Sequence, residues 1–363
     1  MSTHNAARRQ AQGLSCAQPR SRAPLLMLLG MVLVGAFLLD LATGSVMIPL
    51  RDLLAILTGG TPLKAAWADI ILKFRMPKAL TAALAGAALG VSGLQMQTLF
   101  RNPLSGPYVL GISSGASFGV ALVVLLVGVT GSTWLVDLGL AGDFGMALAA
   151  SLGSASVLLL ILLFARKVPT MTLLVLGLMF GYAASALVNV LLYFSVAERI
   201  QTYISWTFGS FGGVTWRQMW VLAPAVIFGL AVAFVSAKPL NAFLLGETYA
   251  HSMGVPVQRA RFGIILSAAV LAGSVTAFCG PISFLGVAIP HLCRMLFNTS
   301  DHRIVMPAAA LLGGSLALVA DLIAQLPGSQ VVLPLNAVTA LIGAPVVIWV
   351  ILHKQNLRSS FAS

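Results

Sequence analysis

Acidic and histidine side chains are the groups of this chain that could do chemistry, and few of them lie within its apolar segments. Asp321 stands alone in the run LVADLIAQL, whereas a proton relay would need several ionisable groups in series. Heme or metal ligation is conceivable for His291 in IPHLCRML, but the other histidines lack the paired spacing of a metal site. We therefore favour structural roles for both residues and predict no metal site and no cofactor.

The sequence carries none of the common hydrolytic motifs. Neither HExxH nor the P-loop GxxxxGK[ST] occurs, and GISSGAS (111–117) resembles a serine nucleophile turn only loosely. The three cysteines, Cys16, Cys279 and Cys293, have no CxxC spacing and are predicted to be free thiols. We predict no catalytic residue and no ATP hydrolysis by this chain, so it is not expected to be an enzyme.

One polar stretch, KPLNAFLLGETYAHSMGVPVQRAR (238–261), interrupts two long apolar segments. It contains Glu247, one of only two glutamates in the chain. Membrane anchoring does not require such an insertion. We interpret it as short helices and turns that form a surface for a soluble partner, which would supply the energy.

The composition predicts the elements that must position these residues. Apolar residues make up 59% of the 363 residues and charged residues only 8%, which is typical of an all-α polytopic membrane protein. At roughly 20 residues per crossing, about ten transmembrane helices are expected. The predicted spans are 24–43, 79–99, 110–129, 145–165, 171–194, 218–237, 262–279, 281–297, 304–324 and 331–352.

Basic residues predict the orientation. The net charge of +12 would suggest nucleic acid for a soluble protein, but basic residues collect in the cytoplasmic loops of membrane proteins. With both termini inside, fourteen of the 21 Lys and Arg residues are cytoplasmic. We therefore expect a cytoplasmic N-terminal tail (1–23), a transmembrane domain (24–353) and a cytoplasmic C-terminal tail (354–363). The run from Leu25 lacks a clear cleavage site, which favours an uncleaved first helix over a signal peptide.

The connecting segments differ in character. Residues 44–78 and 195–217 are expected to form short interfacial helices, and RNPLSGP (101–107) is expected to be a tight loop after the second span. Five of the seven basic residues assigned to the outside lie between 51 and 78, which suggests an acidic partner there. Glycines four residues apart, as at Gly86 and Gly90, predict close helix packing.

Four strings together resemble one family. They are RMPKALTAALAGAALGVSGLQMQTLFRNPLSGPYVLGISSGASFG (75–119), LGETYAHSMGV (245–255), GPISFLGVAIPHLCRML (280–296) and LPLNAVTALIGAP (333–345). In order and spacing they resemble the FecCD-type permeases of bacterial ABC importers for heme, ferric siderophores and cobalamin. The resemblance implies a type II importer permease in the bacterial inner membrane. Its implied partners are a second permease copy, two cytoplasmic ATP-binding subunits and a periplasmic substrate-binding protein.

The same resemblance implies roles for individual residues. The match to the family's coupling helices, which seat on the ATPase, comprises Leu245, Gly246, Glu247, Ala250, Met253 and Gly254. Arg75 and Lys78 match a basic pair that meets the binding protein in the cobalamin importer, whereas a third arginine there is replaced by Gln325. Thr170 and Met171 match the cytoplasmic gate, and the methionine would make that gate more apolar.

The sequence supports several candidate functions, which we rank. Import of an iron chelate, heme or a ferric siderophore, is the leading hypothesis, and cobalamin import by the same architecture is the close alternative. An ion-coupled secondary transporter would need charged residues or broken helices at mid-membrane and would leave 238–261 unexplained. An intramembrane enzyme would lack a catalytic set.

Overall fold

The computed structural model describes residues 22–130, 143–165, 167–326 and 331–352. Within these residues the chain is helical and contains no strand. The long helices are α2 (Ala23–Ala42), α5 (Met76–Leu99), α6 (Ile112–Thr130), α8 (Asp143–Ala165), α9 (Thr170–Phe194), α11 (Trp216–Val235), α14 (Val257–Cys279), α15 (Leu285–Phe297), α16 (His302–Ala324) and α17 (Leu335–Leu352). Each corresponds to one predicted span. Seven described helices are long and apolar enough to cross a membrane, and the apolar helices at α6, α15 and α17 are shorter. The all-α polytopic prediction is confirmed.

Helix α5 forms the centre of the bundle, because 18 of its 24 residues are buried. Its small residues allow α16 to approach closely: a methyl group at Gly86 would overlap the carbonyl of Gly313, and one at Gly90 would lie 2.7 Å from the carbonyl of Ala309. The two backbones therefore touch, as the glycine spacing predicted.

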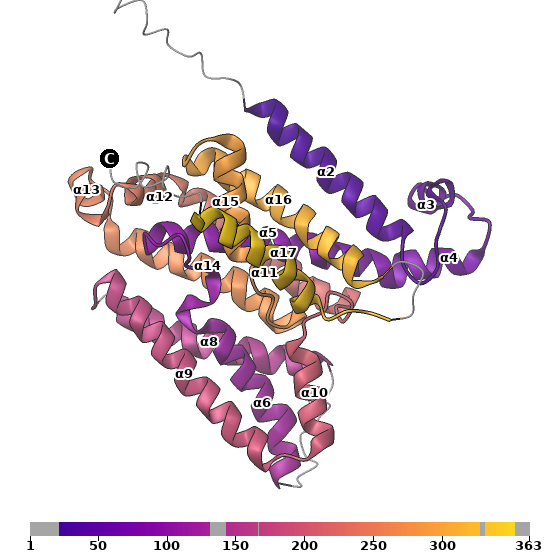
Figure 1. Ribbon diagram of the computed structural model, residues 1–363, viewed down its shortest axis with the longest axis horizontal. Coiled ribbons are helices and arrows are strands. Elements are labelled where there is room, and N and C mark those ends of the chain that lie inside the picture. Colours follow the sequence, from indigo (N-terminus) through magenta and orange to yellow (C-terminus); the bar gives the residue numbers. More distant parts are fainter. Residues whose placement is uncertain (1–21, 131–142, 166, 327–330, 353–363) are drawn as a thin grey trace, which may run out of the picture.

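Helices α6, α8 and α9 pack together in the same way and form a lobe with α10 (Ala197–Thr207) (Figure 1). Gly115 of α6 faces Gly153 of α8, and Gly111 faces Gly177 of α9. Between α5 and α6, the chain turns at Arg101, which has φ 48°, and then forms the short helix η2 (Pro107–Leu110). The loop predicted at 101–107 is confirmed.

The two ends of the bundle carry different short helices. At one end, called the α3 end here, α3 (Leu50–Leu57) and α4 (Ala65–Asp69) project from the body (Figure 1). The π-helix η1 (Ile70–Arg75) then runs directly into α5, so Ala65–Leu99 is a continuous helical run of 35 residues. The expected short helix is found at α3, whereas 65–78 is a direct extension of α5, because charged side chains do not interrupt a helix.

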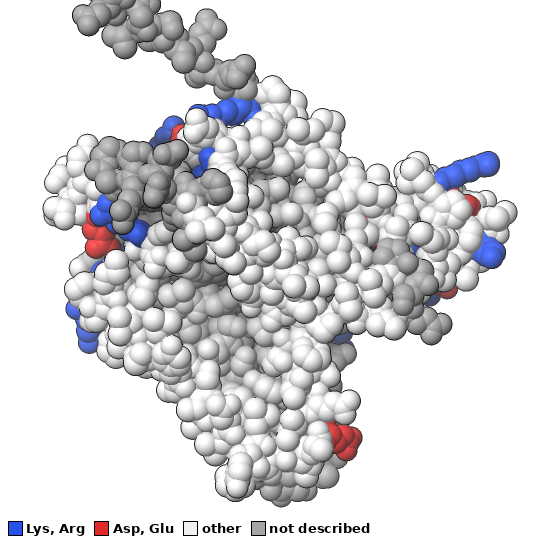
Figure 2. Space-filling view, viewed as in Figure 1, with Lys and Arg blue, Asp and Glu red and all other residues white. Residues whose placement is uncertain are grey.

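At the opposite end, called the α13 end, α12 (Ala237–Leu244) and α13 (Glu247–Ser252) occupy the polar segment. Gly246 and Gly254, with φ 108° and 80°, make the turns on either side of α13. These conformations are costly for any residue with a Cβ atom, which explains the glycines. On the face seen in Figure 2, charged side chains gather near α12 and α13 and at the tip formed by α3 and α4, and the surface between them is nearly uncharged.

Candidate coupling and gating site

The surface of α12 and α13 presents apolar side chains to its surroundings. Leu245 is 54% exposed and Met253 is 60% exposed, whereas Ala250 is buried beneath them. Tyr249, which is 52% exposed, lies between Leu245 and Met253 in the sequence and was not singled out by it. Exposed apolar groups on a polar connection are typical of a protein-binding surface.

A groove of about 810 Å³ adjoins this surface, between α13 and the first turn of α14. Glu247, His251 and Gly254 line it from one side, and Arg259 and Arg261 from the other. The walls of the groove carry both acidic and basic side chains, so the groove can receive a partner that offers polar as well as apolar groups.

Glu247 does not only face this groove. Its carboxylate accepts a hydrogen bond from the hydroxyl of Thr170, the first residue of α9. Arg261 of α14 donates to the same hydroxyl oxygen at 3.1 Å and to the carbonyl of Val168 at 3.1 Å. The structure thus brings together a predicted coupling residue and a predicted gate residue, and it adds Arg261, which belongs to the polar stretch 238–261 but was not predicted as a coupling or gate residue.

Met171, the other predicted gate residue, takes no part in this link. Its side chain is 60% exposed on the surface of α9. Thr170 and Met171 are neighbours in the sequence but differ in environment. Thr170 is hydrogen-bonded to α13, whereas the side chain of Met171 is exposed.

A second polar connection joins α12 to the bundle. Asn241 donates to the carboxylate of Asp301 at 2.7 Å, and its carbonyl oxygen lies 2.7 Å from Nδ1 of His302. Because an amide oxygen can only accept, His302 carries a proton on Nδ1. The Nε2 atom of His302, which is fully buried, lies 2.9 Å from the hydroxyl of Thr98 in α5.

Asp301 also caps α16 by accepting from the Arg303 backbone N–H at 3.0 Å. Partial burial alone would raise the pKa of Asp301, but the hydrogen bonds from Arg303 and Asn241 and the nearby positive charge outweigh it, so the pKa is lowered. The carboxylate is therefore held in its ionised form where α12, α16 and the connecting loop meet.

His291 and Arg294 of α15 make contacts within the same region. The Nε2 atom of His291 lies 2.7 Å from the carbonyl of Pro103, and Arg294 donates to the side chain of Gln97 at 2.7 Å. Among the described residues, no group of three or more His, Cys, Asp or Glu is arranged to hold a metal ion. His291 thus contributes to fixing the loop after α5.

At the α3 end, both predicted docking residues have partners within the chain. Arg75 donates to the carbonyl oxygens of Leu41 and Val46 at 2.8 and 2.5 Å. Lys78 forms an ion pair of 2.9 Å with Asp321, whose side chain is only 6% exposed. Neither cation projects freely from the surface, so their role in docking stays a prediction.

Gln325 completes this cluster. Its amide donates to Asp321 at 2.7 Å and to Asp40 of α2 at 3.0 Å. Asp40 is 2% exposed and was missed by the sequence analysis, although an acid within a predicted span was itself a signal. The cluster ties α2, α5 and α16 together.

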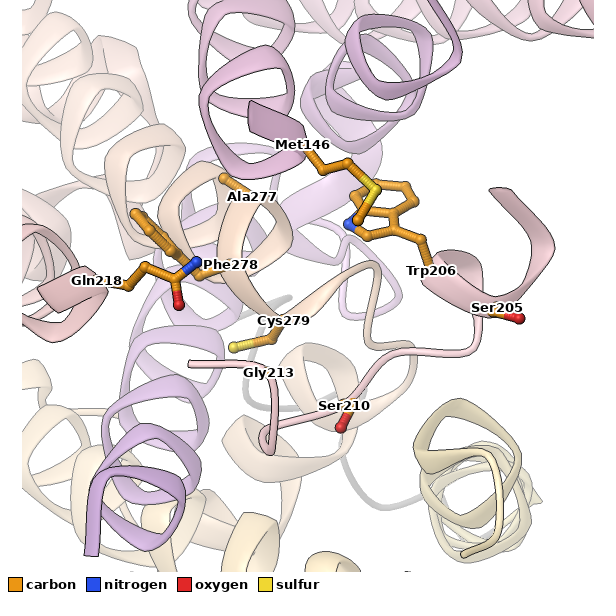
Figure 3. A pocket seen from close by; sticks show the side chains of 9 residues that line it. All are labelled: Met146, Ser205, Trp206, Ser210, Gly213, Gln218, Ala277, Phe278 and Cys279. Carbon is orange, nitrogen blue, oxygen red and sulfur yellow. The ribbon is translucent and has the colours of Figure 1, made fainter. Parts of the chain in front are cut away.

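A smaller cavity of about 100 Å³ lies between α8, α10, α11 and α14. Figure 3 shows Met146 beside Trp206 on one side and the thiol of Cys279 on the other. Gln218 closes the helix cap of α11 through the Thr215 backbone N–H at 2.9 Å. The side-chain amide of Gln218, which lines the cavity, is therefore already used in the fold.

Comparison with known proteins agrees with this architecture. The profile of the FecCD transport family matches residues 30–353. The vitamin B12 import system permease protein BtuC of Shigella boydii is 35% identical over 343 residues, covering 94% of this chain and 99% of that relative. BtuC of Klebsiella pneumoniae is 36% identical over 339 residues, covering 93% of this chain and 96% of the relative.

One solved structure adds to this. A chain from a transporter described as being of the metal-chelate ABC type, in an inward-facing conformation, superposes with a TM-score of 0.79 at 27% identity, covering 91% of this chain and 99% of its own length. An ABC importer permease acts with ATP-binding subunits and a substrate-binding protein. The chain described here belongs to the FecCD transport family and is a multi-pass inner-membrane permease of an ABC importer.

Proposed function

We propose that this permease imports an iron chelate, heme or a ferric siderophore, along a path formed with a second copy of itself. In this proposal residues 24–353 form the membrane domain. Both tails, 1–23 and 354–363, and the α13 end lie in the cytoplasm, as the excess of basic residues there indicates.

ATP hydrolysis would come from two ATP-binding subunits seated on α12 and α13. The exposed Leu245, Tyr249 and Met253 and the adjoining groove support this assignment. The hydrogen bond between Glu247 and Thr170 carries the proposal furthest, because it connects that surface directly to the first residue of α9. A movement of α13 would then shift the proposed gate at Thr170 and Met171.

The periplasmic binding protein would dock at the α3 end. Arg75 and Lys78 supply positive charge there, although each also has a partner within the chain. Charges at such rims steer and orient a partner more than they add affinity. We therefore expect docking to depend on ionic strength.

Two observations bear on the cargo. The likeness to a metal-chelate type transporter and the apolar, exposed Met171 favour an iron chelate such as heme. The curated relatives are named for vitamin B12 import, which makes cobalamin the second candidate.

The test is uptake by the complete complex in liposomes, with heme, a ferric siderophore and cobalamin tried in parallel. ATP-dependent accumulation of heme or the siderophore is expected, and accumulation of cobalamin alone would select the second candidate. Uptake that follows an ion gradient and ignores ATP would overturn the importer proposal, and failure of all three compounds would overturn the cargo assignment.

A further inference from the structure

The helical run from α4 into α5 contains one wide turn. Among the described residues η1 is the only π-helix, in which backbone N–H groups bond to carbonyls five residues earlier. At its end the N–H of Met76 donates to the carbonyl of Ile71. The wide turn adds one residue to the helix, so α4 is turned by about 100° about the helix axis relative to its place in a regular α-helix. Such turns inside α-helices are frequent at functional sites.

Pro77 leaves one carbonyl of this turn open. The next bond of the π-helix would join the N–H of residue 77 to the carbonyl of Leu72, and proline has no N–H. The indole Nε1 of Trp216 donates to that carbonyl instead, at 2.8 Å. In a regular α-helix the N–H of Met76 would already bond to Leu72. The indole therefore completes a bond that the π-helical register leaves open and the α-helical register does not.

Trp216 reaches η1 from a helix whose start is fixed by its own cap. It is the first residue of α11, and Thr215 before it forms a capping box with Gln218. The Thr215 N–H donates to the side chain of Gln218 at 2.9 Å. Helix α11 also packs against α5 and α14. The bundle thus presents the indole N–H at a defined place beside η1.

The register of η1 directs the segment that precedes it. We call residues 50–69, which comprise α3, α4 and their connection, the α3–α4 tip. Within it the carboxylate of Asp52 accepts from the backbone N–H of Leu63 at 2.9 Å, which joins α3 to the connection. Lys64 lies 5.4 Å from the ring centre of Trp67 in α4. Figure 2 shows charged side chains gathered at this tip. A return of η1 to the α-helical register would turn α4 and redirect these charges.

The other attachment of this region defines the register less strictly. Arg75, the last residue of η1, donates to the carbonyls of Leu41 and Val46 and so holds the connection that follows α2. A long arginine side chain can follow a shift of its helix by changing rotamer, whereas an indole has only two rotatable side-chain bonds. The contact between Trp216 and Leu72 is therefore the one that distinguishes the two registers.

We propose that Trp216 is a positioning residue for docking: its N–H locks η1 in the π-helical register and so fixes the orientation in which the α3–α4 tip meets the substrate-binding protein. Trp216 acts through Leu72 and need not touch the partner. The inference rests on the proposed docking at the α3 end and adds the residue that orients the docking surface.

The first test measures the register in the reconstituted complex. Leu63→Cys on the tip and Tyr193→Cys in α9, at positions 81% and 84% exposed, carry spin labels on one permease copy per complex. A Cys16→Ser background keeps Cys279 and Cys293, which are buried and should stay unlabelled. Double electron–electron resonance then reports the distance between the tip and the bundle.

Two replacements at position 216 separate the N–H from the packing of the ring. Trp216→Phe removes the N–H and shortens the ring system, whereas benzothienylalanine at position 216 removes the N–H and keeps its size. Both should shift or broaden the measured distance distribution. Trp220→Phe, one turn further along α11 at a site 81% exposed, is the matched control and should not. An unchanged distribution in both variants, or a change in the phenylalanine variant alone, would overturn the role of the N–H.

The second test is docking of the importer's own substrate-binding protein, carrying a fluorescent label, to the complex in nanodiscs. Its affinity should fall several-fold in both Trp216 variants and stay at the wild-type value in Trp220→Phe. A changed distance with unchanged affinity would overturn the positioning role. If the binding protein does not dock to the wild-type complex, the proposed docking fails and this inference with it. If it docks equally to the wild type and to both Trp216 variants, only this inference fails.

Discussion

The hydroxyl of Thr170 donates a hydrogen bond to the carboxylate of Glu247, across 77 residues of sequence. Thr170 begins α9 and Glu247 begins α13. Arg261, 6% exposed, donates to the same hydroxyl oxygen and holds the loop before α9 through Val168. A displacement of α13 therefore cannot leave the first turn of α9 unaffected without breaking a hydrogen bond to a charged group.

Removing the Thr170 hydroxyl should uncouple ATP hydrolysis from uptake. Thr170→Val keeps the shape of the side chain but loses a hydrogen bond to a charged group. Such a bond contributes about 1.5 kcal/mol, which corresponds to roughly a tenfold change in an equilibrium constant. We expect the number of cargo molecules imported per ATP to fall by up to about tenfold. Thr172→Val, on an exposed site two residues along, is the control. Equal coupling ratios in both variants would contradict a role for this hydrogen bond.

Reversing the charge of Glu247 should separate the ATP-binding subunits from the permease. Glu247→Arg places a second cation near Arg261 and on the wall of the groove at the α13 end. Co-purification of the ATP-binding subunits and stimulated transport should both be lost, while the isolated permease stays folded. Glu198→Arg changes the other glutamate of the chain, which is exposed on α10. If the Glu247 variant co-purifies and transports as well as the Glu198 variant, the coupling assignment is wrong.

The ion pair of Lys78 and Asp321 should contribute more to the free energy of unfolding than the exposed ion pair of Lys73 and Asp69. The side chain of Lys78 is 20% exposed and that of Asp321 is 6% exposed, so Lys78→Met should cost up to about 3 kcal/mol, because the charge of Asp321 then keeps the hydrogen bond from Gln325 but loses its cationic partner. The double variant Lys78→Met with Asp321→Leu should recover most of that loss. Lys73→Met removes an exposed pair with Asp69, in which both side chains are more than 60% exposed, and should cost at most about 1 kcal/mol. Thermal unfolding in detergent measures all three.

The same variants separate folding from docking. Binding-protein affinity should be measured at low salt, where screening is weak. If the double variant is stable and docks normally, Lys78 serves the bundle alone and the docking prediction is wrong for that residue. If it is stable and docks more weakly, Lys78 serves both purposes.

The stabilising effect of the buried contact between His302 and Thr98 should depend on the hydroxyl group of Thr98. Thr98→Val leaves the Nε2 atom of His302 without its partner in a fully buried site, at a cost of about 1–3 kcal/mol. Thr98→Ser keeps the hydroxyl and should cost less. Because His302 connects α5 to α12 through Asn241, we also expect uptake per ATP to fall in the valine variant. Identical unfolding temperatures and coupling in the two variants would rule out this connection.

Asp301 should make stability depend on acid pH. Its pKa is lower in the folded protein than the ordinary value of 3.8, so the charge stabilises the fold above that ordinary value, and this contribution disappears as pH falls through the lowered pKa. Asp301→Ala should cost about 0.5–2 kcal/mol at neutral pH through loss of the α16 cap, and less below about pH 4. Unfolding temperatures across this range check the prediction. A difference between wild type and variant that grows toward low pH would contradict it.

The apolar runs alone determined most of the fold. Each predicted span corresponds to a helix, because a segment without water must satisfy its backbone hydrogen bonds internally. Gly246 and Gly254 likewise indicated the turns around α13, because the preference of a positive φ for glycine depends only on the local backbone. The continuity of 65–78 with α5 was missed, because charge marks exposure and not the end of a helix.

What only the tertiary structure decided is which residues meet. The sequence indicated Glu247 and Thr170 separately, through two different strings, and gave no sign that Arg261 would join them. It also indicated Lys78 as an outward charge, whereas Asp321 and Gln325 from α16 and Asp40 from α2 gather around it. Periodicity shows which face of a helix is apolar. The partner of a polar side chain depends on how distant helices pack: the hydrogen bonds from Thr170 to Glu247, from Arg261 to Thr170 and from Gln325 to Asp40 span 77, 91 and 285 residues of chain.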